Sequence, residues 1–295
     1  MPELPEVETV RRGLEPVLAQ ARLSRVVQRR PDLRFPLPER FVERLQGRTF
    51  RRLDRRAKYI LGYLDSGEVL AIHLGMTGRF SISLPGGANG RQLGEFTHDA
   101  GHDPTHDHVV FETDAGATIT YNDARRFGYM SLIPVAELAA HPHFKGLGVE
   151  PLGPELTPDF LARKATGRTA DLKAFLMDQR IIAGLGNIYV CEALYRSGLS
   201  PNRAASVLVR GNGRPTERCE RLVTAIREVL EAAIVAGGST LRDYRHTDGS
   251  LGYFQHSFSV YGREAEPCMT PGCDGTVKRI TQSGRSTFYC ARCQR

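Results

Sequence analysis

The second and third residues of the chain have groups that together suit covalent chemistry. A proline directly after Met1 favours removal of that methionine, so the mature chain would begin with the secondary amine of Pro2. An α-amine is nucleophilic near neutral pH because its reference pKa is about 7.7–8.0. Its attack on an aldehyde carbon gives an iminium, and the carboxyl group of Glu3 could exchange protons beside it. The alternative is a plain helix start through Pro5, which these residues alone favour.

Four cysteines form the most specific local pattern. Cys268 and Cys273 are separated by four residues, and a gap of sixteen residues leads to Cys290 and Cys293, which are two residues apart. This spacing predicts a tetrahedral zinc site, and four thiolates leave no open position for catalysis, so its role is structural. The alternative is four unrelated thiols. The other two cysteines, Cys191 and Cys219, lie on apolar helix faces and are expected in the core.

Between the cysteine pairs, residues 276–280 and 286–290 read as a β-hairpin with its turn at 281–284 and Arg285 at its tip. An arginine there is ordinarily solvated, but a metal-stapled hairpin could hold it toward a phosphate or an active site. Asn187 follows a glycine-rich turn at 183–186 and opens a helical pattern. It could cap that helix at an anion site, although a plain turn between helices fits equally well.

Two loops after strands combine basic and apolar side chains. Residues 124–128 hold Arg125 and Phe127, and residues 73–78 hold Met76. Such residues suit phosphate contact and wedges that fill the gap left by an extruded base, whereas the alternative places Phe127 and Met76 in the core. Lys58 ends a basic cluster, 48–58, that has six basic residues. A solvated lysine is the default interpretation there.

Composition restricts the class of protein. The chain has 295 residues, 41% hydrophobic and 25% charged, with a net charge of +7 and a pI near 9.2. The hydrophobic and charged shares are typical of a globular protein, and the basic balance suits a polyanionic partner such as nucleic acid, although many basic proteins bind none. The sequence has neither an apolar run long enough for a membrane span nor an apolar signal core. We therefore expect a cytoplasmic protein with reduced or metal-bound cysteines.

The elements that would position these residues change character along the chain. Apolar residues from Leu4 to Leu18 recur at steps of three and four, which predicts an amphipathic helix. Short strand-like segments and turns follow, as in a β-sandwich or barrel, and 85–104 reads as a surface loop. The expected strands are 25–29, 60–64, 69–74, 80–84, 108–112, 118–121 and 129–133, and the expected later helices are 158–165, 171–177, 187–197 and 217–236.

Six motifs, in this order, resemble the bacterial formamidopyrimidine-DNA glycosylase family. They are PELPEVE at 2–8, RRAKY at 55–59, HLGMTG at 73–78, RRFG at 125–128, GLGNIY at 184–189 and RSTFYCARCQ at 285–294. The resemblance implies an α+β multidomain fold: an N-terminal β-sandwich with a leading helix (1–134), a linker (135–156), a helix–two-turns–helix domain (157–261) and a C-terminal four-cysteine zinc-finger β-hairpin (262–295). It also implies one structural Zn²⁺ and a monomeric enzyme.

The activity implied is base-excision repair of damaged double-stranded DNA. A bifunctional glycosylase would remove oxidised purines (8-oxoguanine and formamidopyrimidines), and its abasic-site lyase activity would cut the strand by β,δ-elimination. The resemblance makes Pro2 the nucleophile, Glu3 the acid–base residue, and Lys58 and Arg285 the proton donors of the two eliminations. It assigns DNA contacts to the following residues: Met76, His106, Arg125, Phe127, Arg168 and Asn187.

Two features depart from the usual family pattern. The first cysteine pair is spaced by four residues where many family members have two, and the 85–104 loop is longer than usual beside His106. The segment 247–254 resembles a loop that closes over the extruded base. The rivals are an endonuclease VIII-like glycosylase for oxidised pyrimidines, whose start reads PEGPE, a non-catalytic zinc-dependent DNA-binding protein, and a zinc-ribbon protein that binds RNA or protein.

Overall fold

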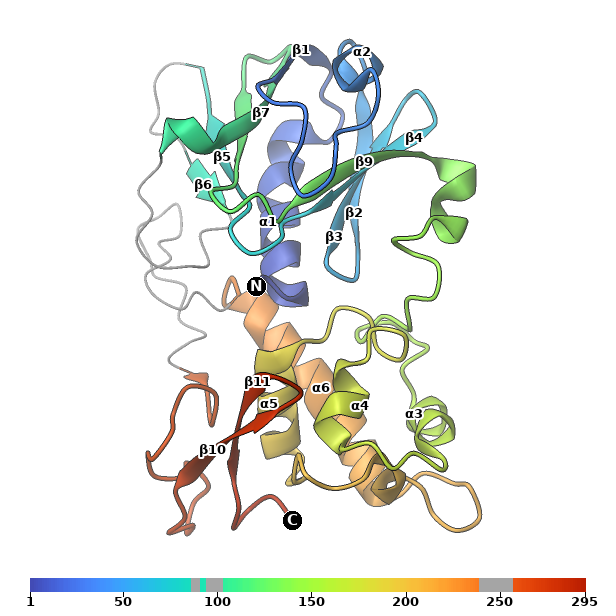
Figure 1. Ribbon diagram of the computed structural model, residues 1–295, viewed down its shortest axis with the longest axis vertical. Coiled ribbons are helices and arrows are strands. Elements are labelled where there is room, and N and C mark those ends of the chain that lie inside the picture. The colour runs from blue at the N-terminus through green and yellow to red at the C-terminus, as the bar shows by residue number, and fades with distance from the viewer. Residues whose placement is uncertain (86–90, 94–102, 239–256) are drawn as a thin grey trace. The chain divides into compact units, whose positions relative to one another are not determined.

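The computed structural model describes residues 1–85, 91–93 (backbone only), 103–238 and 257–295, and it divides into two compact units. The first unit contains Met1–Lys145, and the second contains Gly146–Val235 and the described residues from 257 onward (Figure 1). The division falls inside the predicted linker, and the predicted domain boundaries stay predictions. Among the described residues, no helix combines the length and apolarity that crossing a bilayer requires.

The first unit begins with α1 (Leu4–Leu18), as its apolar spacing predicts. Pro5 occupies the first turn, where its missing N–H costs nothing. The backbone N–H of Glu3 donates to the Glu6 carboxylate over 2.8 Å, which satisfies a donor that a helix start leaves unpaired. The apolar face of α1, including Val7 and Leu14, is buried in the core.

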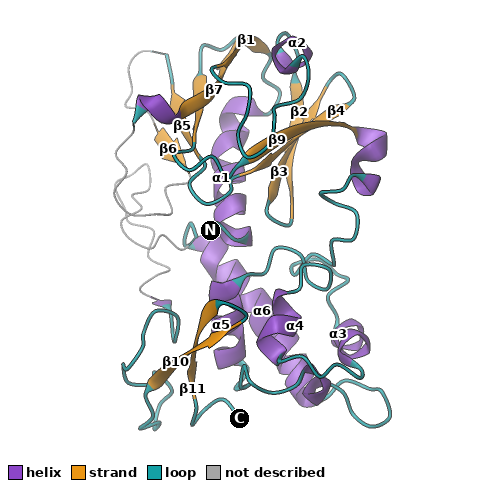
Figure 2. Ribbon diagram, in the orientation of Figure 1, coloured by secondary structure: helices purple, strands orange, loops and turns teal. Residues whose placement is uncertain are grey.

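Two antiparallel sheets share this core, so the predicted β-sandwich is confirmed (Figure 2). The four-stranded sheet has the order β2 (Phe50–Arg56), β3 (Tyr59–Leu64), β4 (Glu68–His73) and β9 (Tyr129–Pro134). The five-stranded sheet has the order β1 (Leu23–Gln28), β7 (Asp107–Thr113), β8 (Thr118–Asn122), β5 (Arg79–Ser83) and β6 (Arg91–Leu93). Two shorter helical segments lie between strands, α2 (Phe41–Leu45) and η1 (Pro104–His106), and a third, η2 (Val135–Ala140), follows β9.

The basic cluster at 48–58 was not expected to form a strand, yet most of it is β2. Its inward positions are only Phe50 and Leu53, so the arginines between them hide the alternation. Phe50 packs against β3 at Gly62, where an added Cβ would overlap the phenyl ring. A bulge between Phe50 and Arg52 further breaks the period of two.

The second unit is helical and ends in a β-hairpin. Its helices are α3 (Pro158–Ala165), α4 (Leu172–Met177), α5 (Asn187–Arg196), η3 (Ala205–Leu208) and α6 (Glu217–Val235). The hairpin consists of β10 (Val277–Gln282) and β11 (Arg285–Cys290), and β11 packs against α5. Side chains that include Cys191 and Phe288 form one buried cluster between helix and hairpin. The predicted helical domain and zinc-finger hairpin are both present.

Candidate active site and nucleic-acid interface

Pro2 and Glu3 lie at the N-terminal end of α1 and are both buried. Glu3 retains 4% of its accessible surface and lies where the helix dipole has its positive end. Met1 before them is 47% exposed. Removal of Met1 would therefore leave the Pro2 amine in a largely dehydrated setting beside a carboxylate.

Lys58 lies in the tight turn between β2 and β3, after Ala57 with its left-handed φ of 51°. It is buried, and α1 packs against both strands. In Figure 1 this turn and the beginning of α1 lie at the same end of the first unit. The structure thus gives Lys58 a protected position in place of the solvated one that the sequence alone favoured.

His73 is a neighbour of Lys58 that the sequence interpretation missed. It ends β4 and pairs in register with Tyr59, the residue after Lys58. Burial, and to a smaller extent the charge of Lys58, lowers the pKa of His73 to about 4. The Gly75 N–H donates to Nδ1 over 3.0 Å, so Nε2 carries the proton of the neutral ring. Its position at the start of the HLGMTG motif was the available signal.

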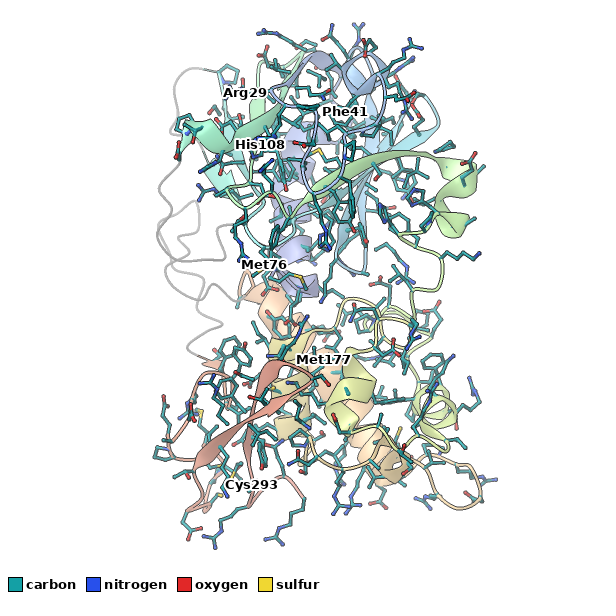
Figure 3. The ribbon with its side chains drawn as sticks, viewed as in Figure 1. Arg29, Phe41, Met76, His108, Met177 and Cys293 are labelled. Atoms are coloured by element: carbon teal, nitrogen blue, oxygen red, sulfur yellow. The ribbon has the colours of Figure 1, made fainter. Side chains whose placement is uncertain are left out.

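The two predicted DNA-contact loops lie together. The backbone N–H of Arg125 donates to the Thr77 hydroxyl over 3.1 Å, which joins the two loops. Arg125 stacks on the Phe127 ring at 4.6 Å, and Phe127 is 40% exposed, which excludes the alternative of a core phenylalanine. Met76 is half-buried and lies at the end of the unit where α1 begins (Figure 3). A pocket of about 390 Å³ lies beside Phe127, lined also by Arg34.

His106 closes η1 with a side chain 39% exposed, and its Nε2 is 3.6 Å from a carboxylate oxygen of Asp103. Its predicted DNA contact remains a prediction. Arg168 is exposed after α3. The hydrogen bond from Arg180 is the main cause that lowers the pKa of Asp178, and the charge of Arg168 adds to it. The guanidinium of Arg168 therefore lies on the same surface as Asp178. The predicted lesion-closing loop, 247–254, lies outside the described residues.

Asn187 does not cap its helix, which excludes one of the two possibilities that the sequence left open. Gly186 is the N-cap of α5, and Asn187 is the first helical residue. Its Nδ2 donates to the Ser286 carbonyl over 2.9 Å and to the Tyr261 hydroxyl over 3.4 Å, while its buried Oδ1 has no protein partner among the described residues. The side chain therefore ties α5 to the strand that begins with Arg285.

Arg285 is not at the tip of its hairpin. The turn consists of Ser283 and Gly284, with φ of 49° and 73°, and Arg285 is the first residue of β11, opposite Gln282. The sequence interpretation had placed a wider turn here. Arg285 is exposed and lines a pocket of about 190 Å³. The same pocket is lined by Met177, the last residue of α4 (Figure 3).

Lys173 anchors this hairpin and was also missed. It lies on α4 with 1% exposure, and its Nζ donates to the Thr287 hydroxyl over 2.6 Å and to the Ser286 carbonyl over 3.2 Å. A lysine on the apolar face of a helix was the signal. Lys173 and Asn187 together hold the backbone that follows Arg285.

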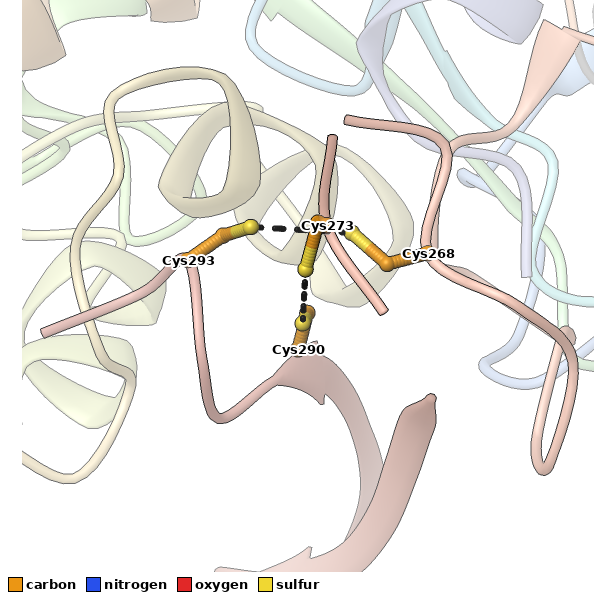
Figure 4. Close-up of side chains that lie close together, drawn as sticks. All are labelled: Cys268, Cys273, Cys290 and Cys293. Atoms are coloured by element: carbon orange, nitrogen blue, oxygen red, sulfur yellow. Dashed lines mark hydrogen bonds between the residues drawn. The ribbon is translucent and has the colours of Figure 1, made fainter. Parts of the chain in front are cut away.

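The four predicted zinc ligands converge (Figure 4). Their sulfur atoms all lie within 4.8 Å of one another, with 3.7 Å between Cys268 and Cys293 and 3.8 Å between Cys273 and Cys290. A tetrahedral zinc with Zn–S bonds of ~2.3 Å requires S–S edges of about 3.8 Å. The residues therefore fit one structural Zn²⁺. The other two cysteines, Cys191 and Cys219, are buried as predicted.

Three family models match the chain in sequence. Residues 1–130 match the formamidopyrimidine-DNA glycosylase N-terminal domain, 147–245 match the H2TH domain of the same enzyme, and 265–295 match a zinc finger found in FPG and IleRS. The formamidopyrimidine-DNA glycosylases of Methylocella silvestris and Afipia carboxidovorans are each 59% identical to it, over the full length of both chains.

Solved structures agree with these matches. The Lactococcus lactis Fpg, in complex with DNA containing an abasic site, is 30% identical with a TM-score of 0.81 and full coverage of both chains. MutM (Fpg) from Thermus thermophilus is 37% identical with a TM-score of 0.78, over 99% of this chain and 98% of that one. The chain belongs to the formamidopyrimidine-DNA glycosylase family.

Proposed function

We propose that the protein is a base-excision repair enzyme that removes oxidised purines, 8-oxoguanine and formamidopyrimidines, from double-stranded DNA and then cuts the strand. Family membership supports the substrate class, and the relative solved with abasic-site DNA supports the second activity. The observation that carries the proposal is the buried Pro2–Glu3 pair at the start of α1, with Lys58 at the same end of the unit.

The chemistry follows from these groups. The Pro2 amine attacks C1′ of the damaged nucleotide and displaces the base, while Glu3 exchanges protons with the opening sugar ring. The resulting iminium acidifies the adjacent C2′–H, and loss of that proton expels the 3′ phosphate. A second elimination expels the 5′ phosphate. Lys58 and Arg285 donate protons in the first and second elimination respectively.

Duplex binding would use residues from both units. Extrusion of the damaged nucleotide costs a few kcal/mol. The space that it leaves is filled by the side chains of Met76, Arg125 and Phe127. His106, Arg168 and Asn187 contact the DNA, and Asn187 is fixed on α5 beside β11. The zinc contributes no chemistry: it staples the hairpin that carries Arg285. We further propose that the enzyme is a cytoplasmic monomer, with the domain boundaries given above.

A covalent trap tests this mechanism. Protein shown by intact mass to lack Met1 is incubated with an 8-oxoguanine duplex and borohydride, which reduces the iminium to a stable adduct. We expect an adduct and strand cleavage. We expect Pro2→Gly to abolish strand cleavage, because its primary amine gives an imine that can lose its proton and become neutral, whereas the iminium of a secondary amine stays charged and acidifies C2′–H. A variant that retains a residue before Pro2 is the matched control, since its amide nitrogen is not nucleophilic. No adduct from verified Pro2-terminated protein would sink the mechanism.

An oxidised-pyrimidine duplex assayed in parallel separates the rivals. An endonuclease VIII-like enzyme would favour that duplex over 8-oxoguanine. A non-catalytic DNA-binding protein would bind both and cleave neither.

A further inference from the structure

We propose that Asp123 is the positioning residue that locks the loop of Met76 and the loop of Arg125 and Phe127 into one rigid unit. This inference rests on the proposed function, in which these loops fill the space behind an extruded base. Asp123 follows β8, directly before the Arg125 loop, and is completely buried.

The Asp123 carboxylate binds donors from three segments. Its Oδ2 accepts the backbone N–H of Gly128 over 2.8 Å and the Tyr121 hydroxyl over 3.3 Å. Its Oδ1 accepts the hydroxyl of Thr77, the residue after Met76. One carboxylate therefore bridges the end of β8, the far end of the Arg125 loop and the Met76 loop.

The Thr77 hydroxyl relays this contact. Because it donates to Asp123, its oxygen is free to accept the Arg125 N–H, at 3.1 Å. The Asp123 carbonyl accepts the Arg126 N–H over 3.2 Å and lies 2.9 Å from Nε2 of His108, so the backbone of Asp123 is held as well. Figure 3 labels both His108 and Met76 in the first unit.

The backbone between the two loops leaves no space for independent movement. A Cβ on Gly75 would overlap backbone atoms of Phe127 and Gly128, and a Cβ on Gly128 would overlap the Tyr121 hydroxyl. Arg126 has a left-handed φ of 56°, which an arginine adopts only where the surroundings enforce it. The hydrogen bonds to Asp123 provide that enforcement.

An asparagine at this position would break the bridge at nearly constant volume. The carboxylate accepts on both oxygens, whereas an amide has a single acceptor oxygen. If that oxygen faces Gly128, the N–H₂ group faces the Thr77 hydroxyl, whose own proton then loses its acceptor; in the opposite orientation the Gly128 N–H loses its acceptor. Buried donors that lose their acceptor destabilise the arrangement that they supported. We expect the loops to separate while the rest of the sandwich keeps its fold.

The predicted defect is specific to base extrusion. An 8-oxoguanine duplex needs the two loops to fill the emptied space, whereas a preformed abasic site has no base to extrude. We expect Asp123→Asn to lower single-turnover excision of 8-oxoguanine by about tenfold, as misplacement of a positioning group does. Borohydride trapping on a preformed abasic site should stay within about threefold of wild type.

The test compares five proteins on both duplexes, with melting temperatures measured alongside. They are wild type, Asp123→Asn, Thr77→Val, the double variant of these two, and the control Asp114→Asn, an exposed carboxylate in the same unit. Thr77→Val should reproduce the selective defect, and the double variant should be no worse than Asp123→Asn, because both remove the same bridge. Asp114→Asn should match wild type.

Unchanged excision by Asp123→Asn, or equal losses on both duplexes, would overturn the proposal. If Asp123→Asn does not fold, Thr77→Val decides by the same criterion. An inactive wild type would instead refute the proposed function, so the two failures are distinguishable.

Discussion

The protonation state of His73 is set by its surroundings in the first unit. Burial is the largest cause that lowers its pKa to about 4, and the charges of Lys58, Arg34 and His143 add to it. The ring is therefore neutral across the physiological range and presents Nε2–H as a fixed donor. The Nε2–H group of His73 can therefore donate a hydrogen bond beside Lys58 without a change in the charge of the ring.

A depressed histidine pKa predicts how stability depends on pH. Between about pH 6.5 and 4 the unfolded chain binds a proton at His73 that the folded chain does not, so the free energy of unfolding falls as pH falls. The loss is complete near pH 4 and amounts to roughly 3 kcal/mol. Urea unfolding of wild type at several pH values, compared with His73→Asn, measures it.

His141→Asn is the matched control, because it removes another histidine of the same unit that does not contribute to the shift at His73. Parallel pH profiles of wild type and His73→Asn would contradict the assignment.

The Asn187 side chain illustrates the limit of local sequence at this scale: its partner Ser286 is ninety-nine residues away. No pattern around Asn187 indicated that contact, and helix-capping statistics pointed elsewhere.

Among the elements, the hairpin strands β10 and β11 depend most on the bound zinc ion for their structure. Gly275 packs where a Cβ would lie 2.9 Å from the Cys290 sulfur and 3.3 Å from side-chain atoms of Arg292. This is tighter than ordinary van der Waals contact, so a larger residue must displace a zinc ligand. The absence of a side chain at Gly275 is thus part of the metal site.

We expect Gly275→Ala to weaken zinc binding by about tenfold, in the range seen when residues that support metal ligands are changed. Competition with a colorimetric chelator gives the affinity directly. Gly211→Ala is the control, because no atom lies within 4 Å of its added Cβ and its backbone has no special φ. Equal zinc release by both variants would show that the hairpin accommodates the methyl group.

Element prediction succeeded where one face of the chain is buried and failed where charges obscured it. The helix from Leu4 and seven strands matched because their apolar residues follow a period of 3.6 or 2. The strand Phe50–Arg56 escaped because its arginines extend outward on both sides of a bulge. The hairpin turn was placed too wide because Thr281 and Gln282 pair across the strands as ordinary ladder residues.

At the scale of the molecule, the net charge of +7 favours a polyanion and makes binding dependent on salt. Each phosphate that a basic side chain neutralises contributes about −0.9 to the slope of log K against log salt concentration. Arg168 is exposed in the second unit and is predicted to contact DNA. We expect Arg168→Gln to reduce the steepness of that slope by about one.

Fluorescence anisotropy of a labelled abasic-analogue duplex over a series of salt concentrations gives the slope. Arg163→Gln is the control, since Arg163 is exposed on α3 and has no predicted DNA contact. If both variants keep the wild-type slope, Arg168 does not contact a phosphate. If both lose equally, the effect belongs to overall charge.

The four-cysteine zinc site determines how long the protein stays active under oxidative stress. Zinc itself has no redox chemistry, and bound here it would hold the four sulfur atoms as thiolates. The sulfur atoms of Cys268 and Cys293 lie 3.7 Å apart, and those of Cys273 and Cys290 lie 3.8 Å apart. An oxidant that removes one electron pair from such sulfurs converts ligands into disulfide and releases the metal. The hairpin that presents Arg285 then loses the metal that stabilises it. The oxidants that damage guanine would thus also inactivate this repair enzyme, so its working life is shortest when its substrate is most abundant.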